Sequence, residues 1–141
     1  MKSFWSLVAV AAWMTFGGGL AQAAIDVTVD HGAVWQTKQA GDNTEGFFDI
    51  HNDGDSADVL TALDCSDADT TSLVDANGKA LKTLTIQPGQ VVSLSQQGPH
   101  VVLLDTHFKV DFGSVLPCSF TFQNAGDIAG YLNAVPAPTA P

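Results

Sequence analysis

Histidine and cysteine side chains are the groups in this chain that could bind a metal ion. The 141 residues include four histidines and two cysteines: His31, His51, His100, His107, Cys65 and Cys118. Neutral imidazole is a common transition-metal ligand, and thiolates prefer soft ions such as Cu(I). His100 follows Gly98-Pro99 at the start of an apolar run, so we expect a strand end to present it at the rim of a domain.

The other three histidines lie close to turn-forming residues. His107 comes seven residues after His100 and reaches the same end of the domain only if the chain folds back, so an exposed turn is the simpler interpretation. His51 closes a strand-like run, and His31 precedes Gly32 in a segment typical of a turn. We take His100, His107 and His51 as candidate metal ligands, with His100 as the principal one.

Cys65 and Cys118 predict a disulfide. An even number of cysteines in an exported chain usually means paired thiols. Closing a loop of this length stabilises a fold by up to about 4 kcal/mol in the chain-entropy model. The alternative is a pair of free thiolates that hold Cu(I).

The acidic segment 52–58 has the composition of a calcium loop without its spacing. If a calcium loop began at Asp53, Ala57 would occupy its fifth position, which must supply a ligand. Asp58 would then stand at the sixth position, where glycine is required. Asp and Asn side chains also bond their own backbone in tight turns. We therefore interpret this segment as a turn.

No catalytic motif is visible in the sequence. It contains no Gly-x-Ser-x-Gly or His-Glu-x-x-His pattern and no phosphate-binding glycine loop outside the N-terminal segment. The acidic residues fall mostly in turns, where both members of an acid/base pair would be solvated. We expect a protein that is not an enzyme.

The charge of the chain limits its partners. It has 15 acidic and 5 basic residues, giving a formal net charge of −10. This surface repels phosphate backbones and anionic lipid, so we expect no nucleic-acid binding. Cationic partners or metal ions are compatible with it, and solubility alone is the simpler explanation.

The two ends of the chain predict export and a loose tail. Lys2, an apolar run from Phe4 to Phe16 and Ala21-Gln22-Ala23 together predict a signal peptide over 1–23. The apolar run is shorter than the roughly 20 residues of a membrane span, so an uncleaved anchor is the lesser alternative. We expect a periplasmic or secreted protein with no stable membrane insertion after cleavage. The Pro/Ala segment 136–141 predicts a disordered tail.

Residues 24–135 predict a single all-β domain, because short runs rich in β-branched and aromatic residues alternate with turn residues. The expected strands are Ile25–His31, Ala33–Thr37, Gly46–Asn52, Val59–Cys65, Thr70–Asp75, Leu81–Ile86, Val91–Ser95, His100–Asp105, Leu116–Gln123 and Ile128–Val135. Asn77-Gly78 is the strongest hairpin turn, since this pair accepts positive φ. Pro117 is expected at a strand start or edge.

The expected core is made of large apolar side chains within these runs. They are Phe47, Phe48, Leu60, Leu63, Leu84, Leu94, Leu103, Phe112, Phe120 and Phe122. Phe120 and Phe122 are two residues apart and so face the same side of their strand.

Several of these stretches resemble the PCuAC family of periplasmic copper chaperones. The strongest are His100–Leu104, Gly113 and Phe120–Gly126, which are similar to the family's His-Leu-Met-Leu stretch, glycine and strand closed by an Ala-Gly turn. Gly46–Asn52 and Leu84–Gly89 resemble an early strand and a later turn of the family. The resemblance covers residues 25–135 and implies a cupredoxin-like Greek-key β-sandwich.

The resemblance also implies a copper site that this chain has lost in part. The family binds Cu(I) through two His and two Met residues, and only His100 matches a ligand position. Val102 stands where a Met follows, Val74 stands near the position of the first His, and the segment around Leu81 has no Met. The only methionines, Met1 and Met14, lie in the predicted signal peptide.

Two functions follow from this comparison. In the first, the chain handles copper through an altered site, with Cu(I) delivered to a cytochrome c oxidase subunit or another periplasmic copper protein. That site would use His100 with His107, His51 or reduced cysteines. In the second, the chain is a metal-free interaction module that kept the fold, since a fold does not determine a function.

Overall fold

The computed structural model describes residues 24–138. The predicted signal peptide 1–23 and the last three residues of the predicted tail lie outside this range. Residues 24–138 contain no helix, and therefore none able to cross a membrane. The strands are β1 Val27–Trp35, β2 Thr44–Asn52, β3 Asp58–Cys65, β4 Ala68–Val74, β5 Leu84–Ile86, β6 Val91–Ser93, β7 His100–Thr106, β8 Val115–Phe122 and β9 Gly126–Val135.

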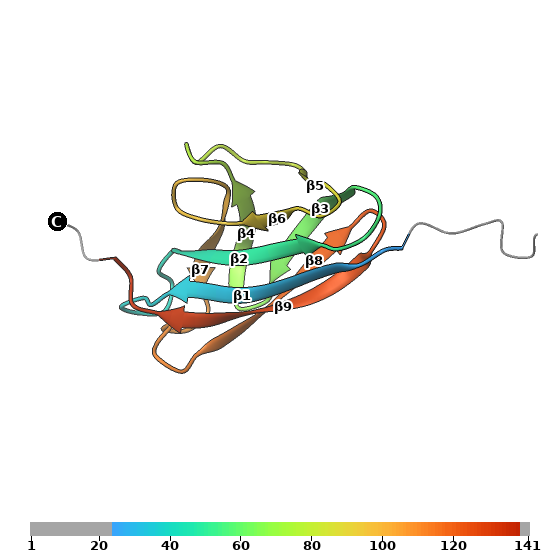
Figure 1. Ribbon diagram of the computed structural model, residues 1–141. Coiled ribbons are helices and arrows are strands. Elements are labelled where there is room, and N and C mark those ends of the chain that lie inside the picture. Colours follow the sequence, from blue (N-terminus) through green and yellow to red (C-terminus); the bar gives the residue numbers. More distant parts are fainter. Residues whose placement is uncertain (1–23, 139–141) are drawn as a thin grey trace, which may run out of the picture.

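All nine strands belong to one sheet in the order β4-β7-β2-β1-β9-β8-β3-β5, with β6 on β2 (Figure 1). Neighbouring strands are antiparallel except β1 and β9, which are parallel. β1 pairs with one edge of β2, and two strands share the other edge of β2. Along that edge, residues 44–46 of β2 pair with β7, and residues 49–51 pair with β6.

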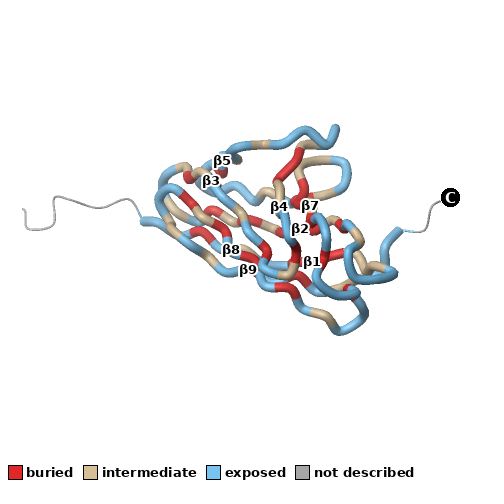
Figure 2. The backbone as a smooth tube through the Cα atoms, turned by 180° about the vertical axis from the view of Figure 1, so that it is seen from behind, coloured by how far each residue is buried: buried red, intermediate tan, exposed pale blue. Residues whose placement is uncertain are grey.

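The sheet curls so that β2 and β8, which are not neighbours in it, face each other across the core. The Phe48 and Phe120 rings meet edge to face with centroids 4.7 Å apart. Gly130 permits this approach, because a Cβ there would lie 2.8 Å from the Phe120 ring and 3.0 Å from the Phe48 ring. Figure 2 shows buried residues along the facing strands. The predicted all-β, cupredoxin-like sandwich is confirmed.

Side chains along β2 alternate strictly between the core and the outer face. Phe48 and Ile50 are almost fully buried, whereas the residues between them are half-buried. Successive side chains of a strand point to opposite faces, so one strand supplies both core packing and an outer row. That row consists of Glu45, Phe47, Asp49 and His51.

The predicted core is confirmed except at one residue. Phe48, Leu60, Leu94, Leu103, Phe120 and Phe122 are buried, and Phe47, Leu63 and Leu84 pack against them with partial exposure. Phe112 was wrongly expected in the core, since 87% of it is exposed. It lies in a turn in which Ser114 N donates to Asp111 O and Gly113 has φ 89°, so its side chain projects away from both layers.

The predicted strands and turns are present, except that two predicted strands form one. The runs Ile25–His31 and Ala33–Thr37 form the single strand β1, interrupted by a bulge. Gly78 has φ 82° in the predicted Asn-Gly turn. In the acidic segment 52–58, Gly54 N donates to Asn52 Oδ1 and the Asn52 amide donates to Ser56 O, as expected of a turn.

The predicted disulfide between Cys65 and Cys118 is present. It joins directly opposed residues of the neighbouring strands β3 and β8, so it links strands within the sheet. Both cysteines are buried. Pro117 directly precedes Cys118, the residue at which the pairing of β8 with β3 ends. On the side of β8 that faces β3, position 117 therefore has no strand partner that needs its missing N–H.

Removing this disulfide should lower the free energy of unfolding by roughly 2–4 kcal/mol, because it closes a loop across 53 residues of sequence separation. Urea unfolding of the oxidised protein, the reduced and alkylated protein, and a Cys65→Ala/Cys118→Ala double variant measures the loss. Equal unfolding midpoints for the three forms would contradict a stabilising role.

Candidate functional site

His100 begins β7, as expected, but its ring is buried, with 7% of the side chain exposed. The Nδ1–H donates to the carbonyl oxygen of Gly98 at 3.0 Å, which fixes the ring orientation. The Phe47 ring lies beside it, with centroids 6.1 Å apart. The Gly98 bond leaves Nε2 as the nitrogen available for another partner.

Glu45 is the partner that Nε2 faces. Its Oε1 lies 3.4 Å from Nε2 of His100, and its buried Oε2 has no hydrogen-bond partner among the described residues. Glu45 is directly opposite Val102 in the β2–β7 ladder, so it projects beside that residue on the same face. The carboxylate therefore lies next to the position at which the resemblance implies a methionine ligand.

A cation would complete the partners of these atoms. With Nδ1 protonated, Nε2 carries either a lone pair or a second proton. A lone pair facing a carboxylate is repulsive unless a proton or a metal ion lies between them, and with a proton there Oε2 still has no partner among the described residues.

The pair is reached from the carboxylate side. Glu45, which is 28% exposed at its side chain, lines a surface cavity of about 350 Å³ together with Trp35, Thr44, Val102 and Leu104. Apolar and polar side chains line this cavity in equal number, the polar ones including Gln36 and Asn43. An ion would meet Glu45 before it met the imidazole.

His107 lies at the other end of β7, roughly 20 Å from His100 along the strand. Its Nε2–H donates to Asp69 Oδ1 at 2.7 Å, and about half of its side chain is exposed. The interaction between the carboxyl groups of Asp69 and Asp105 lowers the pKa of Asp69 and raises the pKa of Asp105. The described structure therefore does not bring His107 and His100 together.

His51 is also separate from His100, since it follows Glu45 by six residues on β2, or roughly 20 Å. Its Nε2 lies 2.8 Å from Asp30 Oδ1, and Nδ1 of His31 lies 2.7 Å from the same oxygen. The three histidines chosen from sequence thus occupy three places.

Sequence reasoning missed Glu45, Asp30 and Asp49, because their proximity to histidine depends on strand register. Period-two alternation along residues 44–52 was the available indication, since it places Glu45, Asp49 and His51 on one face.

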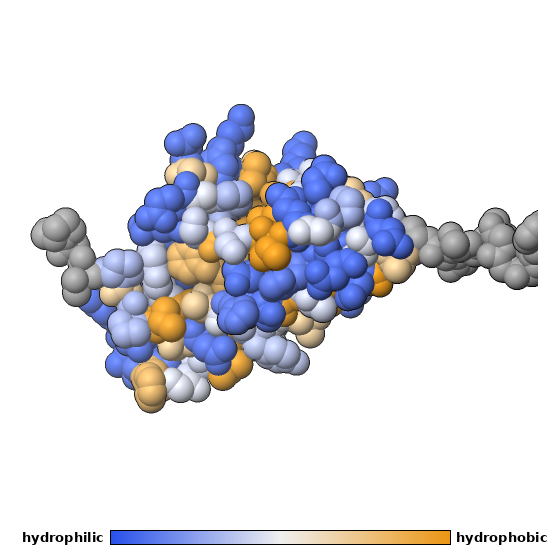
Figure 3. Space-filling model, in the orientation of Figure 1, coloured by the Kyte–Doolittle hydropathy of each residue, from blue (hydrophilic) through white to orange (hydrophobic). Residues whose placement is uncertain are grey.

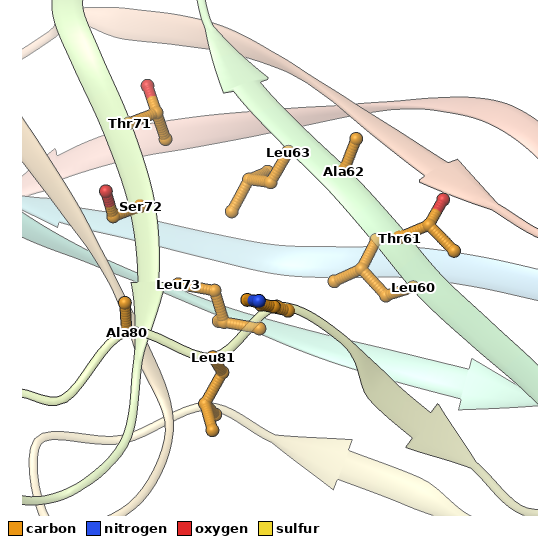
Figure 4. A pocket seen from close by; sticks show the side chains of 10 residues that line it. Leu60, Thr61, Ala62, Leu63, Thr71, Ser72, Leu73, Ala80 and Leu81 are labelled. Atoms are coloured by element: carbon orange, nitrogen blue, oxygen red, sulfur yellow. The ribbon is translucent and has the colours of Figure 1, made fainter.

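A groove between β3 and β4 is lined by none of the histidine, aspartate or glutamate residues described above (Figure 4). Its volume is about 270 Å³, and the lining residues are Leu60, Thr61, Ala62, Leu63, Thr71, Ser72, Leu73, Ala80, Leu81 and Lys82. β4 pairs only with β7, apart from a single bridge at Val74, and β5 covers β3 only over residues 58–60. Two largely unpaired strand edges therefore border the groove.

Comparison with known proteins gives one family and one fold. The sequence model of the LpqE-like family, described as lipoproteins, matches residues 27–133. No curated protein matches the chain.

Similar solved structures include PCuAC domains. The apo domain from PmoF1 has a TM-score of 0.70 at 23% identity, covering 82% of this chain and 100% of that chain. The copper-bound domain from PmoF2 has a TM-score of 0.69 at 19% identity, covering 83% and 99%. CuI-DR1885 from Deinococcus radiodurans has a TM-score of 0.59 at 17% identity, covering 81% and 80%. At these identities the likeness shows the fold.

The carboxyl pair beside His107 gives a pH-dependent contribution to stability. The hydrogen bond with Asp69, together with its charge, raises the pKa of Asp105 above the ordinary 3.8. A folded-state pKa above the unfolded value means that stability falls as the pH rises through it, because the two carboxylates then repel.

Asp105→Asn should therefore raise the melting temperature at pH 7, and the gain should vanish below about pH 4. Asparagine tolerates the φ of 57° at this residue. Asp111→Asn is the matched control and should lower the melting temperature at pH 7. The pKa of Asp111 is lowered by a backbone hydrogen bond from Phe112 and by Lys109, so its carboxylate stabilises the fold above that pKa. Shifts in the same direction for both variants at pH 7 would contradict this account.

Proposed function

The chain belongs to the LpqE-like family and has the fold of PCuAC domains, and from this premise we propose that it is an extracytoplasmic copper-handling protein that holds copper at His100 and Glu45. The predicted signal peptide 1–23 would export it, and the disulfide suits an oxidising compartment such as the periplasm.

The observation that supports this function is the unpartnered, buried Oε2 of Glu45 beside the ordered Nε2 of His100. A buried carboxylate oxygen without a partner costs free energy, and a bound cation removes that cost. The similar structures of the PmoF2 domain and of DR1885 are copper-bound forms, which makes copper the first ion to test.

The donor set differs from a soft Cu(I) site. Val102 supplies no thioether, and the two cysteines are joined in the disulfide. Imidazole binds either oxidation state of copper, whereas a carboxylate favours the harder Cu(II). We therefore expect the His100–Glu45 pair to hold Cu(II) more tightly than Cu(I).

Two protein ligands leave coordination positions free. An incoming ligand from an acceptor can bind the ion before His100 and Glu45 release it, which permits handover without a free ion. The proposed acceptor is a copper-binding protein outside the cytoplasm, such as an oxidase subunit.

A second function is favoured by the groove between β3 and β4. Free strand edges can accept an extended peptide through backbone hydrogen bonds, and both edges of this groove are largely unpaired. In this alternative the chain is a metal-free interaction module. Retention of a peptide by protein stripped of copper would favour it.

Glu45→Gln and His100→Ala should each weaken copper binding at this pair by at least about tenfold, because each removes one of two ligands. Competition against a chelator, with Cu(II) and separately with Cu(I), measures the affinity and the number of equivalents bound. His107→Ala is the matched control and should leave both values unchanged.

Glu45→Gln keeps the size of the side chain, which separates loss of the ligand from loss of packing. If both variants bind as many equivalents as the wild type, with the same affinities, then His100 and Glu45 do not hold copper.

A further inference from the structure

A second group of metal-type side chains lies on the outer face of β1 and β2. It consists of Asp30, His31, Asp49 and His51, and each offers one ligand atom within 4.8 Å of all the others. We propose that these four residues form a separate site for a divalent transition-metal ion, with Cu(II) bound most tightly. The proposal does not depend on the role of His100.

The ladder between β1 and β2 assembles three of the four residues. Asp30 is directly opposite Asp49, and His51 is opposite Thr28, one pair further along the same face. Directly opposed side chains of an antiparallel pair lie about 4.5–5.5 Å apart at Cβ. Strand register therefore places Asp30, Asp49 and His51 around one point on the outer face.

A β-bulge adds His31 to this face. Between the pairs Asp30–Asp49 and Ala33–Phe47, the two residues His31 and Gly32 oppose the single residue Phe48. Without the bulge, His31 would point to the opposite face from Asp30, because side chains alternate along a strand. With it, Nδ1 of His31 lies 2.7 Å from Asp30 Oδ1 and 3.3 Å from Asp49 Oδ2.

Glycine at position 32 makes this bulge possible. A Cβ at Gly32 would overlap the carbonyl oxygen of Tyr131 on β9 and lie 2.7 Å from the Phe48 ring. The Asn133 side-chain amide also donates to the Gly32 carbonyl oxygen. The backbone that presents His31 is thus held by contacts with the core and with β9, although 73% of the His31 side chain is exposed.

The charges of the group fit a divalent ion. Like charges directly opposite each other destabilise a sheet, and Asp30 and Asp49 are such a pair. Asp30 Oδ1 lies within hydrogen-bond distance of a ring nitrogen of both His31 and His51, so imidazole and carboxylate groups already converge on one point. Two carboxylates and two neutral imidazoles balance one ion of charge +2. Figure 3 shows hydrophilic side chains gathered over the middle of β1 and β2.

The donor set selects the class of ion. Two imidazole nitrogens and two carboxylate oxygens suit Cu(II), Ni(II) and Zn(II), whereas Ca²⁺ and Mg²⁺ prefer six or more oxygens. Within the divalent series a nitrogen–oxygen site binds Cu(II) most tightly. Two ligands on opposite sides of an ion, with bonds of about 2.0–2.2 Å, are about 4.0–4.4 Å apart. The four ligand atoms lie within 4.8 Å of one another, so small side-chain rotations would bring them to bonding distance of one ion.

The site is accessible and is separate from Glu45. Asp49 follows Glu45 by four residues on β2, or roughly 13 Å along the strand. His51 is 25% exposed and Asp49 is 31% exposed at the side chain, so an ion can enter from solvent. Changes in one site need not disturb the other.

The test uses Cu(II) alone on the purified exported protein and on variants His31→Asn, His51→Gln and the double variant. Asparagine suits the positive φ of 52° at residue 31. Electron paramagnetic resonance counts the nitrogens bound to Cu(II), and competition with a chelator gives the affinity. His107→Ala is the matched control, and His100→Ala removes the other proposed pair, so that the Cu(II) left in it is assigned to this group.

We expect a Cu(II) species with two imidazole nitrogens in the wild type, distinct from any Cu(II) held at His100 and Glu45 with one. The two-nitrogen species should persist in His107→Ala and in His100→Ala, lose one nitrogen and at least about tenfold in affinity in each single variant, and disappear in the double variant. Zn(II) should compete for the site, and Ca²⁺ should not.

The proposal is overturned if no Cu(II) species with two nitrogens forms, or if the double variant keeps it. A persistent species of that kind would mean adventitious binding elsewhere. Circular dichroism of each metal-free variant checks the fold. If a variant does not fold, broadening of wild-type amide signals by Cu(II) decides the question, and broadening must centre on residues 28–33 and 47–51.

Discussion

The alternation of side chains along β2 is the constraint on which both the fold and the proposed sites depend. Its inward residues include Phe48, which meets Phe120 across the core, and Ile50. Because the core fixes which residues point inward, it also fixes the outer row from Glu45 to His51. A slip of one residue in register would bury that row and expose the core face. Hydrophobic packing therefore positions the charged groups.

The two groups along this row differ in how they could use an ion. The His100–Glu45 pair is largely buried, is oriented by Gly98 and has few ligands, which suits an ion that must be passed on. The group around His31 and His51 has four donors and lies open to solvent, which suits capture. In both, imidazole is combined with carboxylate rather than thioether, so the proposed sites on this PCuAC fold would favour a harder ion than Cu(I).

The fold was largely predictable from sequence, because period-two patterning and turn residues are local signals. Phe112 was misplaced, since its hydrophobicity is visible in sequence but the turn that exposes it is not. His100 was identified through resemblance. Its partner Glu45 was missed because their proximity depends on the register of β2 against β7. In the group around His31, His51 was chosen from sequence, but Asp30 and Asp49 were missed for the same reason, and His31 because a bulge reverses the expected direction of its side chain.

A crystal structure of the protein equilibrated with Cu(II), with anomalous diffraction recorded on both sides of the copper absorption edge, tests the central claim most directly. The claim is that imidazole and carboxylate groups along β2 bind the metal in place of methionine. We expect copper peaks within bonding distance of Nε2 of His100 with Glu45, and within the group of Asp30, His31, Asp49 and His51. Copper bound only elsewhere, or no ordered copper at all, would contradict it.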